Sequence, residues 1–208
     1  MSKLLDGIEF PEDLKKLAID DLPKLASEIR EFIIDVVSKN PGHLASNLGV
    51  VELTIALHYC FDFKRDRIVW DVGHQAYIHK ILTGRKSRFP TLRQYKGLSG
   101  FPCKTESIYD PFTCGHSGSA ISSAMGISCA DEILGFKRSL VAVVGDGAIG
   151  AGMSLEALNH AGDLKKNLLV VLNDNEMSIS NTVGAFSKYL TKIRTLPLFT
   201  DLKKDFHH

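Results

Sequence analysis

The sequence predicts an α/β fold, an open parallel sheet with helices on both of its faces. Two continuous apolar runs, LVAVVGDG at 140–147 and LLVVLNDN at 168–175, are rich in Val and Leu. Such runs are typical of strands that are covered on both faces. A helical segment, MSLEALNHAG at 153–162, lies between them. Strand, helix and strand in this order predict a parallel crossover unit.

The remaining elements are predicted from apolar periodicity and from turn residues. Apolar residues at helical spacing predict a helix over 21–40, with Asp21 as its N-cap and Pro41-Gly42 as its stop. RIVWDV at 67–72 reads as a buried strand that ends at Asp71. Three further helices are expected over 46–60, 73–84 and 117–135, the last of them rich in small residues.

A long segment, 85–116, has the composition of a loop, mostly Gly, Pro, aromatic and polar residues. Loops of this length inside a compact domain are usually functional or disordered. Its aromatic residues favour order. The segment is therefore either an ordered connection or the wall of a ligand cleft.

The bulk composition limits the classes of protein. With 208 residues and a net charge of +1, the chain is expected to form a single domain with a short N-terminal extension and a C-terminal tail. This net charge does not indicate binding to nucleic acid or to an anionic membrane. The sequence has no apolar run of membrane-spanning length and no signal peptide, and its four cysteines form no C-x-x-C pair. We therefore expect a cytoplasmic protein with free thiols; the closing His207-His208 is treated as the remnant of a purification tag.

The glycine turn after the first of the two apolar runs raises the question of its ligand. Gly145, Gly147 and Gly150 satisfy G-x-G-x-x-G, the dinucleotide fingerprint. Asp146, however, puts a carboxylate where a pyrophosphate would lie. Two negative charges about 4 Å apart repel by roughly 4 kcal/mol at an effective dielectric near 20. This repulsion argues against a nicotinamide-dependent dehydrogenase. A divalent cation between the carboxylate and a diphosphate would turn the repulsion into attraction, so the turn fits a metal-bound diphosphate better.

A second ligand for such a cation follows the next strand. If the two strands are neighbours, Asn175 and Asp146 lie at the same edge of the sheet and can reach one ion. A carboxylate, an amide oxygen, a backbone carbonyl and phosphate oxygens suit Mg²⁺. Gly147 and Ala148 would offer backbone N–H groups to the diphosphate. The alternative is that Asp146 and Asn175 merely cap their turns, as Asp and Asn commonly do.

Five motifs together resemble one family. They are GHLASNLGVVELTIALHYCFD, IVWDVGHQAYIHKILTGR, KGLSGFP, GHSGSAIS and VVGDGAIGAGMSLEALNHAGDLKKNLLVVLNDNEMSIS. They are similar to the N-terminal domain of 1-deoxy-D-xylulose-5-phosphate synthases, which are transketolase-like enzymes that bind thiamine diphosphate. The resemblance implies that the side chains of Asp146 and Asn175 and the carbonyl of Met177 bind the metal. It implies that Gly147, Ala148 and Asn175 bind the diphosphate. It also implies that His74 and the Gly115-His116-Ser117 turn contact the cofactor, and that His43 faces the reacting centre.

The resemblance also implies an activity. Members of the family condense pyruvate with glyceraldehyde 3-phosphate with loss of CO₂, use thiamine diphosphate and Mg²⁺, and are homodimers whose product feeds isoprenoid and thiamine synthesis. Imidazole suits the proton transfers of this reaction near neutral pH, so His43 and His74 are the candidate catalytic residues. Taken alone, the position of His43 favours a loop residue satisfied by backbone, whereas the resemblance favours the active site. His58, His79 and His160 are expected to be packing or surface residues.

The sequence departs from the family pattern in four respects. Gly118-Ser119 stands where Ser-Thr is usual, Ile78 where proline is usual, and Pro41 where glycine is usual. The pyrimidine-binding domain, with its activating glutamate, and the C-terminal domain are absent from these 208 residues. We therefore expect the missing half to act in cis or in trans, and the chain alone to bind the Mg²⁺-diphosphate weakly without turnover. The alternative is a non-catalytic assembly or regulatory module that retains the fold.

Overall fold

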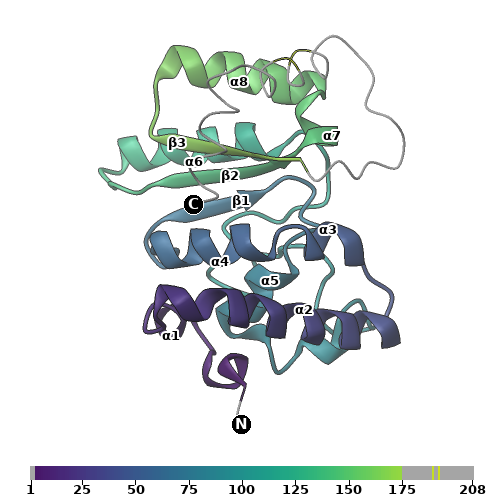
Figure 1. Ribbon diagram of the computed structural model, residues 1–208. Helices are drawn as coiled ribbons and strands as arrows, with labels where there is room; N and C mark the ends of the chain where they lie inside the picture. Colours follow the sequence, from purple (N-terminus) through teal and green to yellow (C-terminus); the bar gives the residue numbers. More distant parts are fainter. Residues whose placement is uncertain (1–2, 175–188, 190–191, 193–208) are drawn as a thin grey trace. The chain divides into compact units, whose positions relative to one another are not determined.

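The protein is built around a three-stranded parallel sheet (Figure 1). The structure, a computed structural model, describes residues 3–174, Tyr189 and Lys192. The strands are β1 (Arg67–Trp70), β2 (Leu140–Gly145) and β3 (Leu168–Asn173), in the order β1-β2-β3. Both pairs are parallel. The predicted α/β class and the predicted crossover between the two apolar runs are confirmed.

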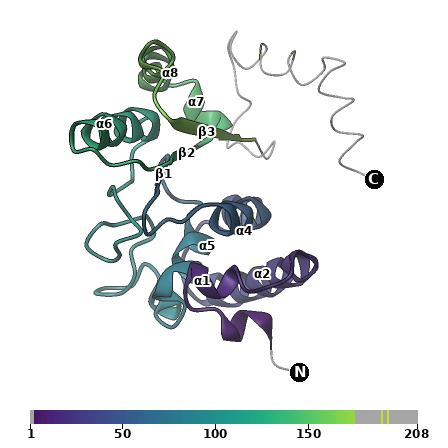
Figure 2. The same ribbon diagram turned by 90° about the vertical axis from the view of Figure 1, so that its left-hand side faces the viewer.

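Helices cover both faces of the sheet, as Figure 2 shows. On one side lie α6 (Ala120–Ile133) and α8 (Gly152–Leu164), which connect β1 to β2 and β2 to β3. On the other side, Leu57 of α4 (Val51–Cys60) packs in one buried cluster with side chains of β1 and β2. The strand residues in this cluster are Ile68, Trp70, Val141 and Val143. They alternate along each strand because successive side chains point to opposite faces.

A second core lies beneath that face and joins the N-terminal helices. The helix α2 (Leu22–Lys39) buries one face, with Leu25, Ala26, Ile29, Ile33 and Val36 in the core. Short elements before it complete the layer: η1 (Leu4–Gly7), α1 (Pro11–Leu14) and η2 (Ile19–Asp21). The predicted helix over 21–40 is confirmed. Asp21 stands at the N-cap position of α2, as predicted, but its backbone is helical and its side chain makes no capping hydrogen bond.

Two predicted helices are interrupted. The segment 46–60 forms α3 (Leu44–Leu48) and α4, separated at Gly49. In the segment 73–84, a turn comes first, then α5 (Tyr77–Lys80) and a wide turn, η3 (Ile81–Arg85). The turn before α5 holds Val72 at φ 58° and Gly73 at φ 86°. A β-branched residue in the left-handed region is a steric outlier, so the chain here is strained.

The long segment 85–116 is ordered and forms one short helix, η4 (Phe89–Thr91). Phe89 and Tyr109 are buried, whereas Tyr95 is exposed. Aromatic residues thus anchor the segment at two points, as their presence predicted. All four cysteines are free, and no helix of the described part is long and apolar enough to cross a membrane.

The strand β3 is less covered than its sequence predicts. Every residue of β2 before Gly145 is buried, but Leu169 and Leu172 of β3 are 45% and 38% exposed. The prediction that both strands are covered on both faces is therefore right for β2 and wrong for β3. In the described sheet β3 is an edge strand with β2 as its neighbour, so fewer side chains cover it.

A buried chain of polar groups ties α4 and α5 to the long loop. His58 Nε2 lies 2.9 Å from His79 Nδ1, and His79 Nε2 lies 2.9 Å from Asp110 Oδ1. Since carboxylate Oδ1 accepts, His79 donates from Nε2 and receives from His58 at Nδ1. Arg85 binds the same carboxylate at 2.6 and 3.0 Å. His58 and His79 are thus packing residues in a polar network, and His160 is exposed.

Stability is expected to fall as the pH drops below about 6.5, the ordinary pKa of histidine. Burial lowers the pKa of both His58 and His79, for His58 with a further contribution from the charge of His79. Below that pH the unfolded chain binds protons that the folded chain does not, so the free energy of unfolding decreases, by up to about 1.4 kcal/mol per pH unit for each histidine. Urea unfolding between about pH 7.5 and about pH 5.5 measures this. Equal free energies across that range would contradict it, and His160→Gln should leave the slope unchanged.

Candidate functional site at the carboxyl edge of the sheet

The carboxyl ends of the strands bring the predicted ligand-bearing turns to one edge. Trp70 lies opposite Val143, and Gly145 lies opposite Asn173. The segments that follow Gly145 and Asn173 therefore start side by side, as the metal-site prediction requires. Asn175 and Met177 lie outside the described residues, so their roles remain predictions.

The turn after β2 offers open space beside its glycines. The short helix α7 (Asp146–Ile149) begins directly after Gly145, with Asp146 partly buried and Gly147 exposed. A Cβ placed on Gly145, Gly147 or Gly150 would meet no atom within 4 Å. Room therefore exists next to the backbone of this turn, which fits the approach of a phosphate group.

Asp71, directly after β1, fixes the neighbouring turn. Its side chain is buried, and it accepts hydrogen bonds from the N–H groups of Gly118 at 2.8 Å and Ala120 at 3.0 Å. The Val72 N–H donates to the His116 carbonyl at 3.3 Å. The Gly115-His116-Ser117 turn is thereby held beside the residues that lead to His74. Sequence reasoning took Asp71 only as the end of a strand; the signal was a carboxylate at a buried strand end.

Close backbone contacts join these turns to each other and to the long loop. Gly118 has φ 85°, and a Cβ there would lie 3.0 Å from Ala151 Cβ, at the start of α8. A Cβ on Gly73 would lie 2.4 Å from Pro102 Cδ. Glycine is needed at both positions, because a side chain would clash and the backbone is left-handed. The turns after β1, before α6 and after β2 thus form one connected edge.

The two predicted catalytic histidines lie next to each other. The ring centroids of His43 and His74 are 5.3 Å apart in an edge-to-face arrangement, and Phe101 of the long loop lies 6.1 Å from His43. The contact with Phe101 makes the loop one border of the histidine pair. The His43 N–H donates to the side-chain oxygen Oη of Tyr77 at 3.1 Å, and the catalytic role of His43 stays a prediction.

Both histidines are neutral near pH 7. Burial lowers the pKa of His43, with a smaller contribution from the charge of Arg93. Burial also lowers the pKa of His74, and His43 adds to this against the opposing effect of Asp71. Within the described residues, Nδ1 of each ring is buried without a hydrogen-bond partner.

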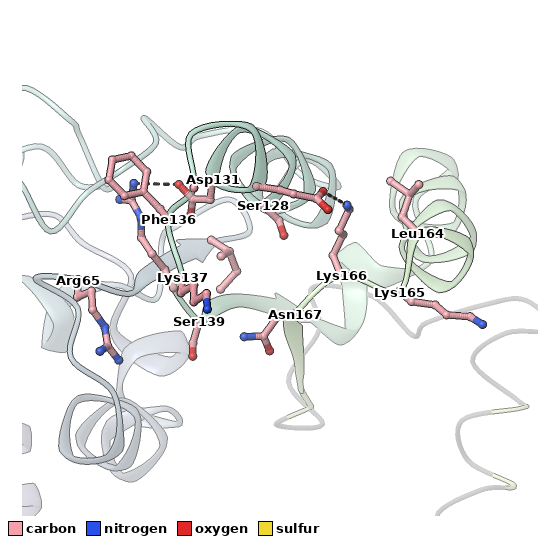
Figure 3. A pocket seen from close by; sticks show the side chains of 14 residues that line it. Arg65, Ser128, Asp131, Phe136, Lys137, Ser139, Leu164, Lys165, Lys166 and Asn167 are labelled. Atoms are coloured by element: carbon pink, nitrogen blue, oxygen red, sulfur yellow. Dashed lines mark hydrogen bonds and ion pairs between the residues drawn. The ribbon is translucent and has the colours of Figure 1, made fainter.

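A cavity of about 640 Å³ lies at the opposite edge of the sheet, where β2 begins (Figure 3). Charged side chains dominate its lining, and several pair with each other: Arg138 with Asp131 at 2.9 Å, and Lys166 with Glu132. None of the predicted site residues lines it. The cavity therefore plays no part in the site at the carboxyl edge.

Comparison with known proteins gives one consistent result. A family model described as 1-deoxy-D-xylulose-5-phosphate synthase matches residues 5–208. The chain is 60% identical over 205 residues to 1-deoxy-D-xylulose-5-phosphate synthase 1 of Geobacter sulfurreducens, covering 99% of this chain and 32% of that protein. The corresponding protein of Clostridium acetobutylicum is 56% identical over 205 residues, covering 99% of this chain and 33% of that protein. The chain thus spans about a third of the length of these curated relatives.

A solved structure shows the same fold. The transketolase from Leishmania mexicana matches with a TM-score of 0.69 and 23% sequence identity, covering 82% of this chain and 30% of that chain. At this identity the likeness concerns the fold alone. It agrees with the α/β architecture predicted from the sequence.

Proposed function

Since the chain belongs to the 1-deoxy-D-xylulose-5-phosphate synthase family, we propose that it is the part of such an enzyme that binds thiamine diphosphate and Mg²⁺. The whole enzyme would be a transferase that condenses pyruvate with glyceraldehyde 3-phosphate with loss of CO₂. One observation carries the proposal: the register that pairs Gly145 with Asn173. It starts the Asp146 turn and the segment after β3 side by side at one edge of the sheet.

The residues of the β2–α7 turn fit a metal-bound diphosphate. Asp146 would hold Mg²⁺ through its carboxylate, with the Asn175 side chain and the Met177 carbonyl as further ligands. Gly147 and Ala148 would donate backbone N–H groups to the phosphates. The open space beside Gly147 supports this assignment. The metal resolves the repulsion that a carboxylate and a diphosphate would otherwise suffer.

The histidine pair fits proton transfer beside the cofactor. When bound, thiamine diphosphate would supply the electron sink for loss of CO₂ and for formation of the new carbon–carbon bond. His43 and His74 would donate protons to oxygens of the reacting molecules or accept protons from them. The Gly115-His116-Ser117 turn would contact the cofactor. The ring separation of 5.3 Å lets both imidazoles face one small substrate.

The proposal includes partners. A pyrimidine-binding domain, in cis or in trans, would complete the cofactor site, and a homodimer is the expected assembly. The 208 residues alone are expected to bind the cofactor weakly and to show no turnover.

Calorimetric titration with thiamine diphosphate tests the proposal. Heat of binding is expected with Mg²⁺ and is expected to vanish when the metal is removed by a chelator. Asp146→Ala should weaken binding at least about ten-fold, because the Mg²⁺ loses a charged ligand. Asp163→Asn, at an exposed position of α8, is the matched control and should bind as the unaltered chain does.

Two outcomes would contradict the proposal. Binding that is the same with and without metal, or unchanged in Asp146→Ala, would remove the metal site. Complete absence of binding would favour the alternative, a non-catalytic assembly or regulatory module with the same fold.

A further inference from the structure

The side chain of Asn47, on α3, is wholly buried between the two histidines. Its exposed fraction is 0%. The amide nitrogen Nδ2 donates to the His43 carbonyl at 2.6 Å and to the His74 carbonyl at 2.8 Å, and Oδ1 accepts from the Tyr77 N–H at 2.9 Å. Both amide hydrogens and the amide oxygen are therefore used. All three partners belong to the backbone around the histidine pair.

Tyr77 closes the same network from the other side. Its hydroxyl accepts the hydrogen bond of the His43 N–H at 3.1 Å, and its side chain is fully buried. A Cβ on Gly42 would come within 3.1 Å of that hydroxyl, so the loop before His43 fits closely against it. The backbones of His43 and His74 are thus linked through two side chains, although they are far apart in the sequence.

We propose that Asn47 is a positioning residue that sets the separation of the two imidazoles. Its carbonyl partners belong to the histidines themselves, so a change in the amide moves both rings. Only an amide of this length offers two donors and an acceptor at these positions; a carboxylate would place an oxygen against two carbonyl oxygens. The consequence for cofactor binding rests on the proposed function, whereas the geometric consequence does not.

A merely structural role is the competing explanation, because a buried amide also stabilises the core. Thr54 on α4 supplies the matched control. It is also fully buried, and its hydroxyl donates to Val50 O at 2.7 Å, within its own helix region and away from the histidines. Thr54→Val therefore removes a buried polar group without touching the histidine pair.

The test combines imidazole NMR with calorimetry on the 208-residue chain. The resonances of His43 and His74, among eight histidines, are assigned with His43→Gln and His74→Gln. In Asn47→Asp and in Asn47→Ser, which adds no charge, we expect the ring resonances of both histidines to shift and those of His160 to stay in place. Affinity for thiamine diphosphate with Mg²⁺ should fall by about ten-fold or more. Thr54→Val should change neither, whatever stability it loses.

The outcomes separate the positioning role of Asn47 from the proposed binding of thiamine diphosphate. If a folded Asn47 variant leaves both ring resonances and the affinity as in Thr54→Val, the positioning role is overturned. If Asn47→Asp does not fold, the ring resonances and the affinity of Asn47→Ser decide the role. If the unaltered chain binds no thiamine diphosphate, the proposed function fails, and the ring resonances still decide the role of Asn47.

Discussion

Replacing Asp110 with alanine is expected to lower the free energy of unfolding by about 3–5 kcal/mol. The Asp110 side chain is fully buried and accepts from His79, twice from Arg85, and from the Cys103 N–H at 2.8 Å. Burial alone would raise the pKa of this carboxyl, but His79 and Arg85 hold it well below its usual range. Without the carboxylate, the buried Arg85 guanidinium loses both hydrogen bonds to Asp110, and Glu106, 3.7 Å away, already pairs with Lys80. The expected loss is therefore large.

Urea unfolding of Asp110→Ala and of a matched surface variant measures this loss. Asp35 also pairs with a cation, Lys39 at 2.7 Å, but both side chains are more than half exposed. Asp35→Ala should therefore change the free energy of unfolding by less than about 0.5 kcal/mol. If the two variants were equally stable, the buried network would contribute no more than a surface ion pair, and the prediction would be wrong.

Asp71→Ala is expected to impair both stability and cofactor binding. Two buried N–H groups, of Gly118 and Ala120, lose their acceptor, at a cost of about 1–3 kcal/mol each. The Gly115-His116-Ser117 turn then loses its attachment to the end of β1. Affinity for thiamine diphosphate with Mg²⁺ should fall by about ten-fold or more, because this carboxylate orients the turn that we propose contacts the cofactor.

Asp66 provides a control of the same chemistry at the other end of β1. It is buried, and its carboxylate accepts from the Ser139 N–H at 2.9 Å and the Asp62 N–H at 3.1 Å. Asp66→Ala should cost comparable stability in urea unfolding and leave the calorimetric affinity unchanged. Equal affinities for the Asp66 and Asp71 variants would show that the turn before α6 does not depend on Asp71.

The sequence predicted the sheet because two of its strands are continuous apolar runs, up to Val144 in β2 and up to Leu172 in β3. The runs that end at Gly145 and Asn173 have the composition of parallel strands, and the helix between them predicts a parallel connection. The burial of β3 was overestimated, because an apolar sequence alone does not distinguish a strand at the edge of a sheet from one at its centre. The break at Gly49 was missed because the apolar periodicity runs through it, and the helix predicted from Gly73 begins only at Tyr77.

The candidate site was predictable as a set of residues and much less as an arrangement. Asp146, Gly147 and Ala148 follow from a strand end and a glycine turn. The contact between His43 and His74 depends on the Asn47 and Tyr77 hydrogen bonds, for which a sequence gives no periodic signal. The buried pairing of Asp110 with Arg85 and His79 is equally hidden, because charged residues in a polar loop look like surface residues.

The left-handed backbone of Val72 links the stability of this fold to the position of His74. A β-branched residue there costs about 1–3 kcal/mol relative to a relaxed conformation. Selection for thermal stability alone would favour glycine or asparagine at position 72, because both residues tolerate a positive φ. Glycine there would give more backbone freedom to the turn between Asp71 and His74, so a gain in stability would come with a less fixed position of His74.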